Sequence, residues 1–261
     1  LAFFLGGWIG QNYGWRWAFY LLGFPGLLLA VLVFLLREQP RGSMDRGVAQ
    51  PAGGGASQLF ASRPLRYLFA GYALLGLASN NLAIWGPTFF VRVHHMSILT
   101  IGAAAGIISV VIGIPAMILG GYFSDRVSRM LPGGRMAFTA LAALASVPLW
   151  LALLYVNNIP LLIAVNVVLY ALAIMWVGPA TADVTEIAGP NLRGLAIGVF
   201  FSIVNIAAYG IGSPLIGKMS DYLGVTKDAE VMRYSLLVCP VACAMGALLL
   251  WIGSRARTAA R

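Results

Sequence analysis

The sequence predicts an all-α protein that crosses a membrane several times. Of its 261 residues, 60% are hydrophobic and only 10% are charged, and the mean hydropathy is +0.87. Soluble globular domains carry about 25% charged residues, so water cannot be the main solvent of this chain. Several charge-free runs reach the roughly 20 residues that a helix needs to cross the hydrocarbon core of a bilayer. The lipid bilayer is therefore the first predicted partner.

The first two apolar runs are followed by a segment of different composition. Residues 1–11 are predicted to be the last half of a span, and residues 17–36 a complete crossing, because Arg16 and Arg37 flank a charge-free run. Residues 37–66 are rich in Arg, Gly, Pro, Ser and Gln, which is typical of a linker. The chain opens on Leu inside an apolar run, without the basic flank of a signal peptide, so we expect a portion of a longer protein.

Six further spans are predicted between residues 67 and 253, followed by a short tail at 254–261. Residues 136–182 carry no formal charge and are too many for one crossing, so the sequence Asn-Asn-Ile-Pro at 157–160 is predicted to divide them. The predicted spans cover residues 67–90, 99–123, 136–156, 160–182, 194–217 and 234–253.

The distribution of basic residues predicts the orientation of the spans. With the 37–66 linker in the cytoplasm, 12 of the 17 Lys and Arg residues lie in cytoplasmic segments and 5 on the opposite side, as the positive-inside rule requires. The C-terminus is then cytoplasmic as well. The net charge of +9 does not indicate a nucleic-acid partner, because these arginines lie in short loops between apolar runs rather than on one solvated face.

A short internal repeat links two of the predicted spans. The pattern Gly-x-x-Ser-Asp at 121–125 recurs at 217–221, 96 residues later. Each copy closes the middle span of a three-span unit, and the predicted topology places the two copies on opposite sides of the membrane. This arrangement is typical of inverted repeats, in which one three-helix unit is used twice around a central site.

The segment that begins at Gly121, Gly-Tyr-Phe-Ser-Asp-Arg-Val-Ser-Arg, resembles the loop signature G-x-x-x-D-R-x-G-R-R/K of the major facilitator superfamily of secondary transporters. Ser128 stands where the signature has Gly, and Met130 where it has a second basic residue. Residues 6–19 resemble the passage from span five to span six of that family, and residues 212–221 the end of its span eleven. Three further segments are most similar to its spinster-like branch: 89–94, 193–196 and 233–234.

This resemblance implies a helical bundle with inverted three-helix repeats in the cell (inner) membrane. Residues 1–36 would end an N-terminal bundle, 37–66 would be a cytoplasmic linker, and 67–253 would form the C-terminal six-helix bundle. The missing N-terminal bundle is then a partner. The implied activity is secondary active transport of a small organic or amphipathic solute by alternating access, with proton coupling or organic-anion symport as variants. The competing interpretation is a non-transporting membrane remnant or scaffold.

The loop signature supplies a candidate gate, formed by Gly121, Asp125, Arg126 and Arg129. We hypothesise that Asp125 latches the cytoplasmic gate in the outward-facing state by lying against the N-terminus of the span that begins near Gly194, where the helix dipole would stabilise a carboxylate by about 0.3–2 kcal/mol. The alternative is a solvated carboxylate paired with Arg126 or Arg129, which also follow the positive-inside rule. Gly121 is expected to let two helices approach closely.

Polar groups at membrane depth are costly and usually face a cavity or a partner helix. The spans at 67–90, 160–182 and 194–217 carry such groups and are predicted to line a substrate cavity, whereas the spans that begin at 136 and 234 are predicted to face lipid. For each residue the alternative is an interhelical hydrogen bond or, for Trp85, a place in the aromatic belt. The cavity candidates are Asn81, Trp85, Trp176, Asn205 and Tyr209.

Charged and titratable residues near the span ends suggest two further roles. Asp183, Glu186 and Arg193 are predicted to form either a solvated ion-pair cluster at the cytoplasmic end or a group that couples transport to protons. His94 and His95 are expected to be solvated loop residues rather than sensors of external pH.

Catalysis is not predicted from this sequence. No metal-ligand spacing, phosphate loop or nucleophile-His-acid pattern occurs in it, so we expect no enzyme activity, metal or cofactor. Cys239 and Cys243 lie inside the last span and are expected to be small core residues.

Overall fold

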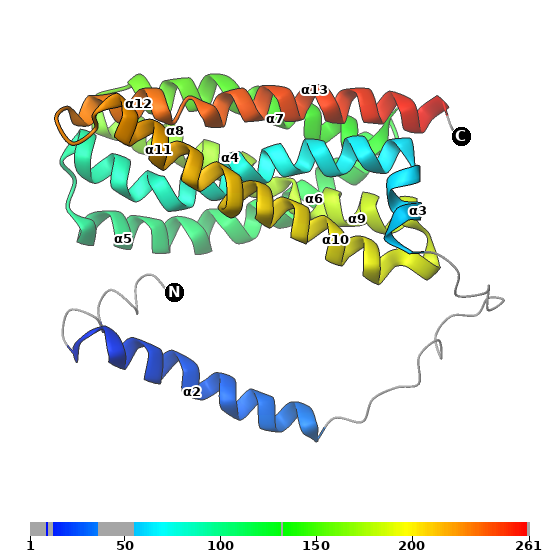
Figure 1. Cartoon of the computed structure of the whole chain (residues 1–261), viewed down its shortest axis with the longest axis horizontal. Helices are drawn as coiled ribbons and strands as arrows, with labels where there is room; N and C mark the ends of the chain where they lie inside the picture. Colours follow the sequence, from blue (N-terminus) through cyan, green and yellow to red (C-terminus); the bar gives the residue numbers. More distant parts are fainter. Residues whose placement is uncertain (1–8, 10–12, 36–54, 132, 260–261) are drawn as a thin grey trace.

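The computed structural model describes residues 9, 13–35, 55–131 and 133–259. In this part of the chain six helical segments are long and apolar enough to cross a membrane, which confirms the predicted six-span bundle. Consecutive spans run in opposite directions and are joined at alternating ends of the bundle (Figure 1). The spans are Arg63–His94, Ile98–Ser128, Gly134–Tyr155, Ile159–Ala188, Pro190–Leu223 and Ala229–Thr258.

Two spans are single helices, α4 (Arg63–His94) and α7 (Gly134–Tyr155). The other four are interrupted. Their helices are α5 (Ile98–Ile108) with α6 (Ile114–Ser128), α8 (Ile159–Met175) with α9 (Val177–Ala188), α10 (Arg193–Asn205) with α11 (Ser213–Leu223), and α12 (Met232–Ser235) with α13 (Val238–Ala259). We call the end at which α4 begins and α13 finishes the Arg257 end of the bundle, and the opposite end the His94 end.

Two helices precede the bundle. α2 (Trp15–Phe34) matches the predicted crossing at 17–36 and is drawn apart from the bundle in Figure 1. The short helix α3 (Ala56–Ala61) and the first turn of α4 occupy the last part of the predicted linker, and Leu59 of α3 is buried. The predicted half-span at 1–11 lies almost entirely outside the described residues, as does most of the linker.

Local sequence explains where several spans begin and end. The Ser97 hydroxyl accepts a hydrogen bond from the N–H of Thr100 at 3.1 Å and caps α5. Asn158 caps α8 in the same way, at 3.0 Å from the N–H of Leu161, and this is the turn that the sequence predicts between two spans. α11 ends at Gly224, which adopts the left-handed conformation with φ 85°.

The spans differ in how much of their surface the bundle covers. Of the most apolar stretch of each span, 61% is buried in α4, 50% in the α12–α13 span and 44% in α7. The corresponding values are 17% for α5–α6, 22% for α8–α9 and 22% for α10–α11. The sequence predicts α7 and α13 as peripheral helices because they carry few polar groups. The structure corrects this for α13, which packs against both α4 and α7 through small buried residues such as Ala242, Gly246 and Ala247.

α6 packs closely against the break between α8 and α9 at Gly120. A Cβ atom on Gly120 would lie 2.4 Å from the carbonyl oxygen of Met175 and 2.9 Å from its Cα. Pro179 has no N–H, so it cannot donate the usual helical hydrogen bond to that carbonyl. The sequence assigns the close approach to Gly121. A Cβ on Gly121 would meet no atom within 4 Å, so the tight contact is at Gly120, although the Gly121 backbone lies beside Gly178 of α9.

The middle span of each three-helix unit contains a π-helical segment. These segments are η1 (Ser109–Gly113) and η3 (Ile206–Gly212), and each is followed two residues later by a proline, Pro115 or Pro214. A proline removes one N–H from the helical ladder, and a π-helical turn is one way to accommodate that loss. The repeated Gly-x-x-Ser-Asp patterns close these same spans and lie at opposite ends of the bundle, as inverted repeats require (Figure 1).

Candidate functional site

Five charged side chains meet at the Arg257 end of the bundle. Arg135, near the start of α7, lies 2.6 Å from Asp125 (Nε to Oδ1) and 2.8 Å from Glu186 (Nη1 to Oε2). Arg257, near the end of α13, lies 2.7 Å from Asp183 Oδ1 and 2.7 Å from Glu186 Oε1. We call these five residues the ion-pair cluster. It ties α6, α7, α9 and α13 together.

Asp183 is the buried centre of the ion-pair cluster. Its side chain is 0% exposed, and its Oδ1 lies 3.7 Å from Nη1 of Arg135 in addition to its contact with Arg257. Its Oδ2 is buried and has no hydrogen-bond partner among the described residues. Three carboxylates face two guanidinium groups, so the cluster carries one negative charge in excess. A buried carboxylate depends on its paired cations, and Arg257 is the nearer of the two.

The position of Asp125 differs from both expectations. It does not pair with Arg126 or Arg129, and its ion-pair partner in the structure is Arg135 rather than the helix N-terminus near Gly194. Arg135 is ten residues away in sequence, but the turn after α6 returns the chain beside Asp125, and Glu186 holds the guanidinium from its other side. Arg126 and Arg129 are exposed, and water weakens the pairing of exposed charges.

The predicted cluster of Asp183, Glu186 and Arg193 is correct in its acids and wrong in its base. Arg193 opens α10 just after the short helix η2 (Pro190–Leu192), where its side chain is exposed and takes no part in these ion pairs. Arg135 and Arg257 supply the positive charges instead. The cluster is also not solvated throughout, because Asp183 is fully buried.

Arg233 holds together the His94 end of the bundle. It is 7% exposed, and its guanidinium donates to the carbonyl oxygen of Leu154 at the end of α7 and to Asn157 Oδ1 at 2.9 Å. Its Nε lies 2.5 Å from Glu230, and its Cζ lies 5.8 Å from the centre of the Phe89 ring on α4. We call this set of contacts the Arg233 clamp.

Arg135 and Arg233 occupy equivalent places in the two three-helix units. Each is the second residue of the helix that opens the third span of its unit, α7 or α12. Each also contacts the end of the other unit: Arg135 bonds to Glu186 near the end of α9, and Arg233 bonds to the end of α7. The inverted repeat therefore extends to the contacts that close each end of the bundle.

Arg233→Met is expected to destabilise the protein by about 1.5–3 kcal/mol, because hydrogen bonds from a charged donor are lost, one of them to the buried Leu154 carbonyl. Thermal unfolding of the purified protein in detergent measures this as a lower midpoint. Arg92→Met is the matched control, since Arg92 is exposed at the same end of the bundle. Equal midpoints for the two variants would contradict the clamp.

The structure separates the two histidines at this end. His95 is exposed and ends α4 in the left-handed conformation with φ 54°. His94 is half-buried, with its ring 5.3 Å from that of Phe89 (between centres), and its Nε2 has no hydrogen-bond partner among the described residues. The prediction of a solvated side chain is therefore wrong for His94, because the last turn of α4 packs its ring against neighbouring aromatic side chains.

Asn81 makes an interhelical contact inside the bundle. It is 0% exposed, and its amide donates to the carbonyl oxygen of Leu77 at 2.8 Å and to that of Ala208 in η3 at 3.1 Å. Gly212 allows this contact, because a Cβ there would lie 2.7 Å from the Asn81 amide nitrogen. In this structure Asn81 therefore packs η3 against α4 and does not face an open cavity.

The adjacent residue, Asn80, is half-buried and lies beside an exposed residue of η3. Its amide donates to the Gly76 carbonyl at 2.8 Å, and its Oδ1 accepts the Tyr209 hydroxyl at 2.8 Å. Tyr209 is 51% exposed, and Asn205, one turn earlier, is exposed as well. We call Asn80, Asn205 and Tyr209 the polar face. The sequence predicts two of its members and misses Asn80.

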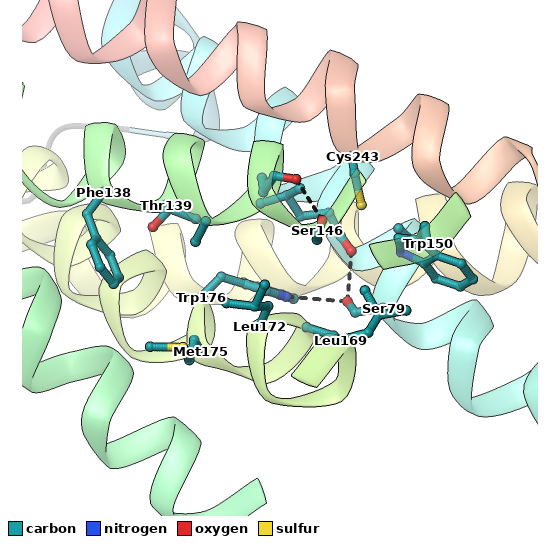
Figure 2. Close-up of a pocket in the computed structure, with 15 residues that line it drawn as sticks. Ser79, Phe138, Thr139, Ser146, Trp150, Leu169, Leu172, Met175, Trp176 and Cys243 are labelled. Atoms are coloured by element: carbon teal, nitrogen blue, oxygen red, sulfur yellow. Dashed lines mark hydrogen bonds between the residues drawn. The ribbon is translucent and has the colours of Figure 1, made fainter. Parts of the chain in front are cut away.

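Trp85 and Trp176 both donate hydrogen bonds within the bundle. The Trp85 indole lies 3.2 Å from the Ser213 hydroxyl, and the Trp176 indole lies 3.3 Å from the Ser79 hydroxyl. Figure 2 shows Trp176 and Ser79 on the wall of a cavity that Ser146 also lines. The cavity has a volume of about 20 Å³, which is room for about one water molecule. It is too small for an organic solute.

Comparisons with known proteins agree with this architecture. A family model described as Major Facilitator Superfamily matches residues 1–208. An MFS-type efflux pump of Mycolicibacterium smegmatis (strain ATCC 700084 / mc(2)155) is 25% identical over 252 residues, which are 95% of this chain and 58% of the pump. The probable sphingolipid transporter spinster homolog 1 of Arabidopsis thaliana is 24% identical over 91% of this chain and 54% of that protein. The chain thus spans somewhat more than half the length of these relatives.

A solved structure has the same fold. It is the crystal structure of a bacterial homolog to the human lysosomal transporter Spinster, in an inward-facing and occupied conformation. The TM-score is 0.68 at 20% sequence identity, over 95% of this chain and 61% of that one. The match to the family model, the spinster homologues and the six-span bundle with inverted repeats lead to one assignment: the chain belongs to the Major Facilitator Superfamily.

Proposed function

We propose that this chain forms part of a secondary transporter of the inner membrane, which moves a small organic or amphipathic solute by alternating access. The observation that carries the proposal is the low coverage of α5–α6, α8–α9 and α10–α11, which bury only 17%, 22% and 22% of their most apolar stretches. A second bundle and a solute path beside these spans would account for it. The family and the names of the two relatives support the class of activity, and the name of the Arabidopsis relative supports an amphipathic solute.

The ion-pair cluster is the proposed element of the cytoplasmic gate. It lies at the end of the bundle that the basic residues assign to the cytoplasm, beside the loop signature with Gly121, Arg126 and Arg129. All five of its side chains belong to the six-helix bundle, so the cluster holds this end of the bundle together. Arg126 and Arg129 are exposed beside it. Asp183, with its unpaired Oδ2, is the proposed site of proton coupling.

Transport is tested with the transporter that contains this chain, in liposomes and with two probes, a fluorescent sphingosine analogue and carboxyfluorescein. We expect the sphingosine analogue to cross faster than in protein-free liposomes, and faster still with an imposed pH gradient. Asp183→Asn should remove the effect of the gradient. Movement of carboxyfluorescein alone would favour organic-anion symport, and no protein-dependent movement of either probe would contradict the proposal for these two solute classes.

A further inference from the structure

The polar face contains unused hydrogen-bonding groups near the middle of the spans α4 and α10–α11. Asn80 and Tyr209 are joined at 2.8 Å, which leaves one amide N–H of Asn80 and the lone pairs of the Tyr209 oxygen. No hydrogen bond to the Asn205 side chain is found within the described part of the chain, so its amide offers both donors and acceptors. Groups of this kind at membrane depth face a cavity or a protein partner rather than lipid.

No formal charge accompanies these groups. In the described spans every Asp, Glu, Lys and Arg lies near a span end, as in the ion-pair cluster and the Arg233 clamp. An ion brought to the polar face would therefore lose its hydration without meeting an opposite charge on this bundle, and that is unfavourable. A hydroxyl or amide group, in contrast, can both donate to and accept from the three side chains of the polar face.

We infer that the polar face binds an uncharged hydroxyl- or amide-bearing group, with Asn80 and Tyr209 as a paired contact and Asn205 as a second one. The inference rests on the proposed transport function and adds to it the chemical class of the solute group that this bundle recognises. The apolar part of the solute then lies along the surrounding side chains, such as Ile206 and Ile211, which are 60% and 57% exposed.

Single cysteines on the polar face test both its access to water and its charge preference. Cys239 and Cys243 are the two cysteines of the chain, and both are buried, so their replacement by alanine gives a background for Asn205→Cys and Tyr209→Cys. The protein in membrane vesicles is treated with three methanethiosulfonates of similar size. One carries a neutral hydroxyethyl group, one a trimethylammonium group and one a sulfonate. Each rate is divided by the rate of the same reagent with a free thiol.

We expect the neutral reagent to react at both positions about tenfold faster than either charged one, which corresponds to about 1.4 kcal/mol of unfavourable electrostatic work. Leu144→Cys is the control, because Leu144 is 56% exposed on α7, away from the polar face. It should react with none of the three reagents, because a thiol that faces lipid does not form the reactive thiolate.

Two outcomes would overturn the inference. If either charged reagent matches the neutral one at Asn205→Cys, the face does not select uncharged groups. If no reagent reacts at either position while the unfolding midpoint shows that Tyr209→Cys is folded, protein or lipid covers the face and it does not bind a solute from water. In the second case the liposome assay can still detect transport, so a failure of this inference remains distinct from a failure of the proposed function.

Discussion

Gly120→Ala is expected to destabilise the bundle by about 3 kcal/mol or more, the upper part of the range for an overpacked core. The added methyl group would lie 2.4 Å, 2.9 Å and 3.0 Å from the oxygen, Cα and carbonyl carbon of Met175, which are all backbone atoms. No side-chain rotation can relieve such a clash, so α6 and α8 must separate. Thermal unfolding in detergent measures the loss.

Gly121→Ala is the matched control for this substitution. It adds the same methyl group to the next residue of the same helix, where a Cβ would meet no atom within 4 Å. Alanine is favoured over glycine in a helix by about 1 kcal/mol, so Gly121→Ala should leave the midpoint unchanged or raise it. If both variants unfold at the same temperature, the close approach of α6 to the α8–α9 break is refuted.

Arg257→Met is expected to cost about 3–5 kcal/mol, the usual range when one partner of a buried ion pair is removed. Asp183 would keep only the contact to Arg135 at 3.7 Å, and its buried Oδ2 is already without a partner in the described structure. The substitution also removes a bond to Glu186, but that carboxylate is 45% exposed and can be hydrated. Unfolding in detergent, compared with the native protein, measures the effect.

Arg255→Met controls for the loss of one positive charge near the C-terminus. Arg255 is exposed on the same helix, with its Cζ 5.6 Å from the centre of the Trp251 ring, and its removal should cost less than about 1 kcal/mol. The double variant Asp183→Asn with Arg257→Met should recover much of the lost stability, because removal of both partners leaves no unpaired buried charge. A double variant as unstable as Arg257→Met alone would argue against the pair.

The fold follows from the sequence to a large extent, because length and charge decide it. Charge-free runs of about 20 residues allow few structures in a bilayer. The Asn-Asn-Ile-Pro turn is visible as well, since Asn158 caps a helix and Pro160 fits its first turn. It is harder to predict which helices the rest of the bundle buries, because polar residues indicate only some of the contacts between helices. The buried face of α13 is built mainly from small residues, above all alanine, glycine and cysteine, which give no signal in a polarity pattern.

The candidate site is less predictable, because its partners are far apart in the chain. Asp183 and Arg257 are separated by 74 residues, and nothing near Asp183 distinguishes Arg257 from Arg193 as its cation. The polar face shows a finer limit. Asn80 and Asn81 are adjacent polar residues, and a rotation of one residue decides which is buried. That rotation depends on the contact of Gly212 with α4, which a period-based prediction does not resolve.

The π-helical segments fix the rotational phase of the half-spans that follow them. An α-helix turns by about 100° per residue, so the deletion of one residue from η1 would rotate α6, the rest of that span, by that angle relative to α7. Asp125 would then point away from Arg135, although no residue of the ion-pair cluster had been altered. The same holds for α11 after η3. Length changes that are harmless in the loops of this bundle would therefore reorient whole half-helices in these two places.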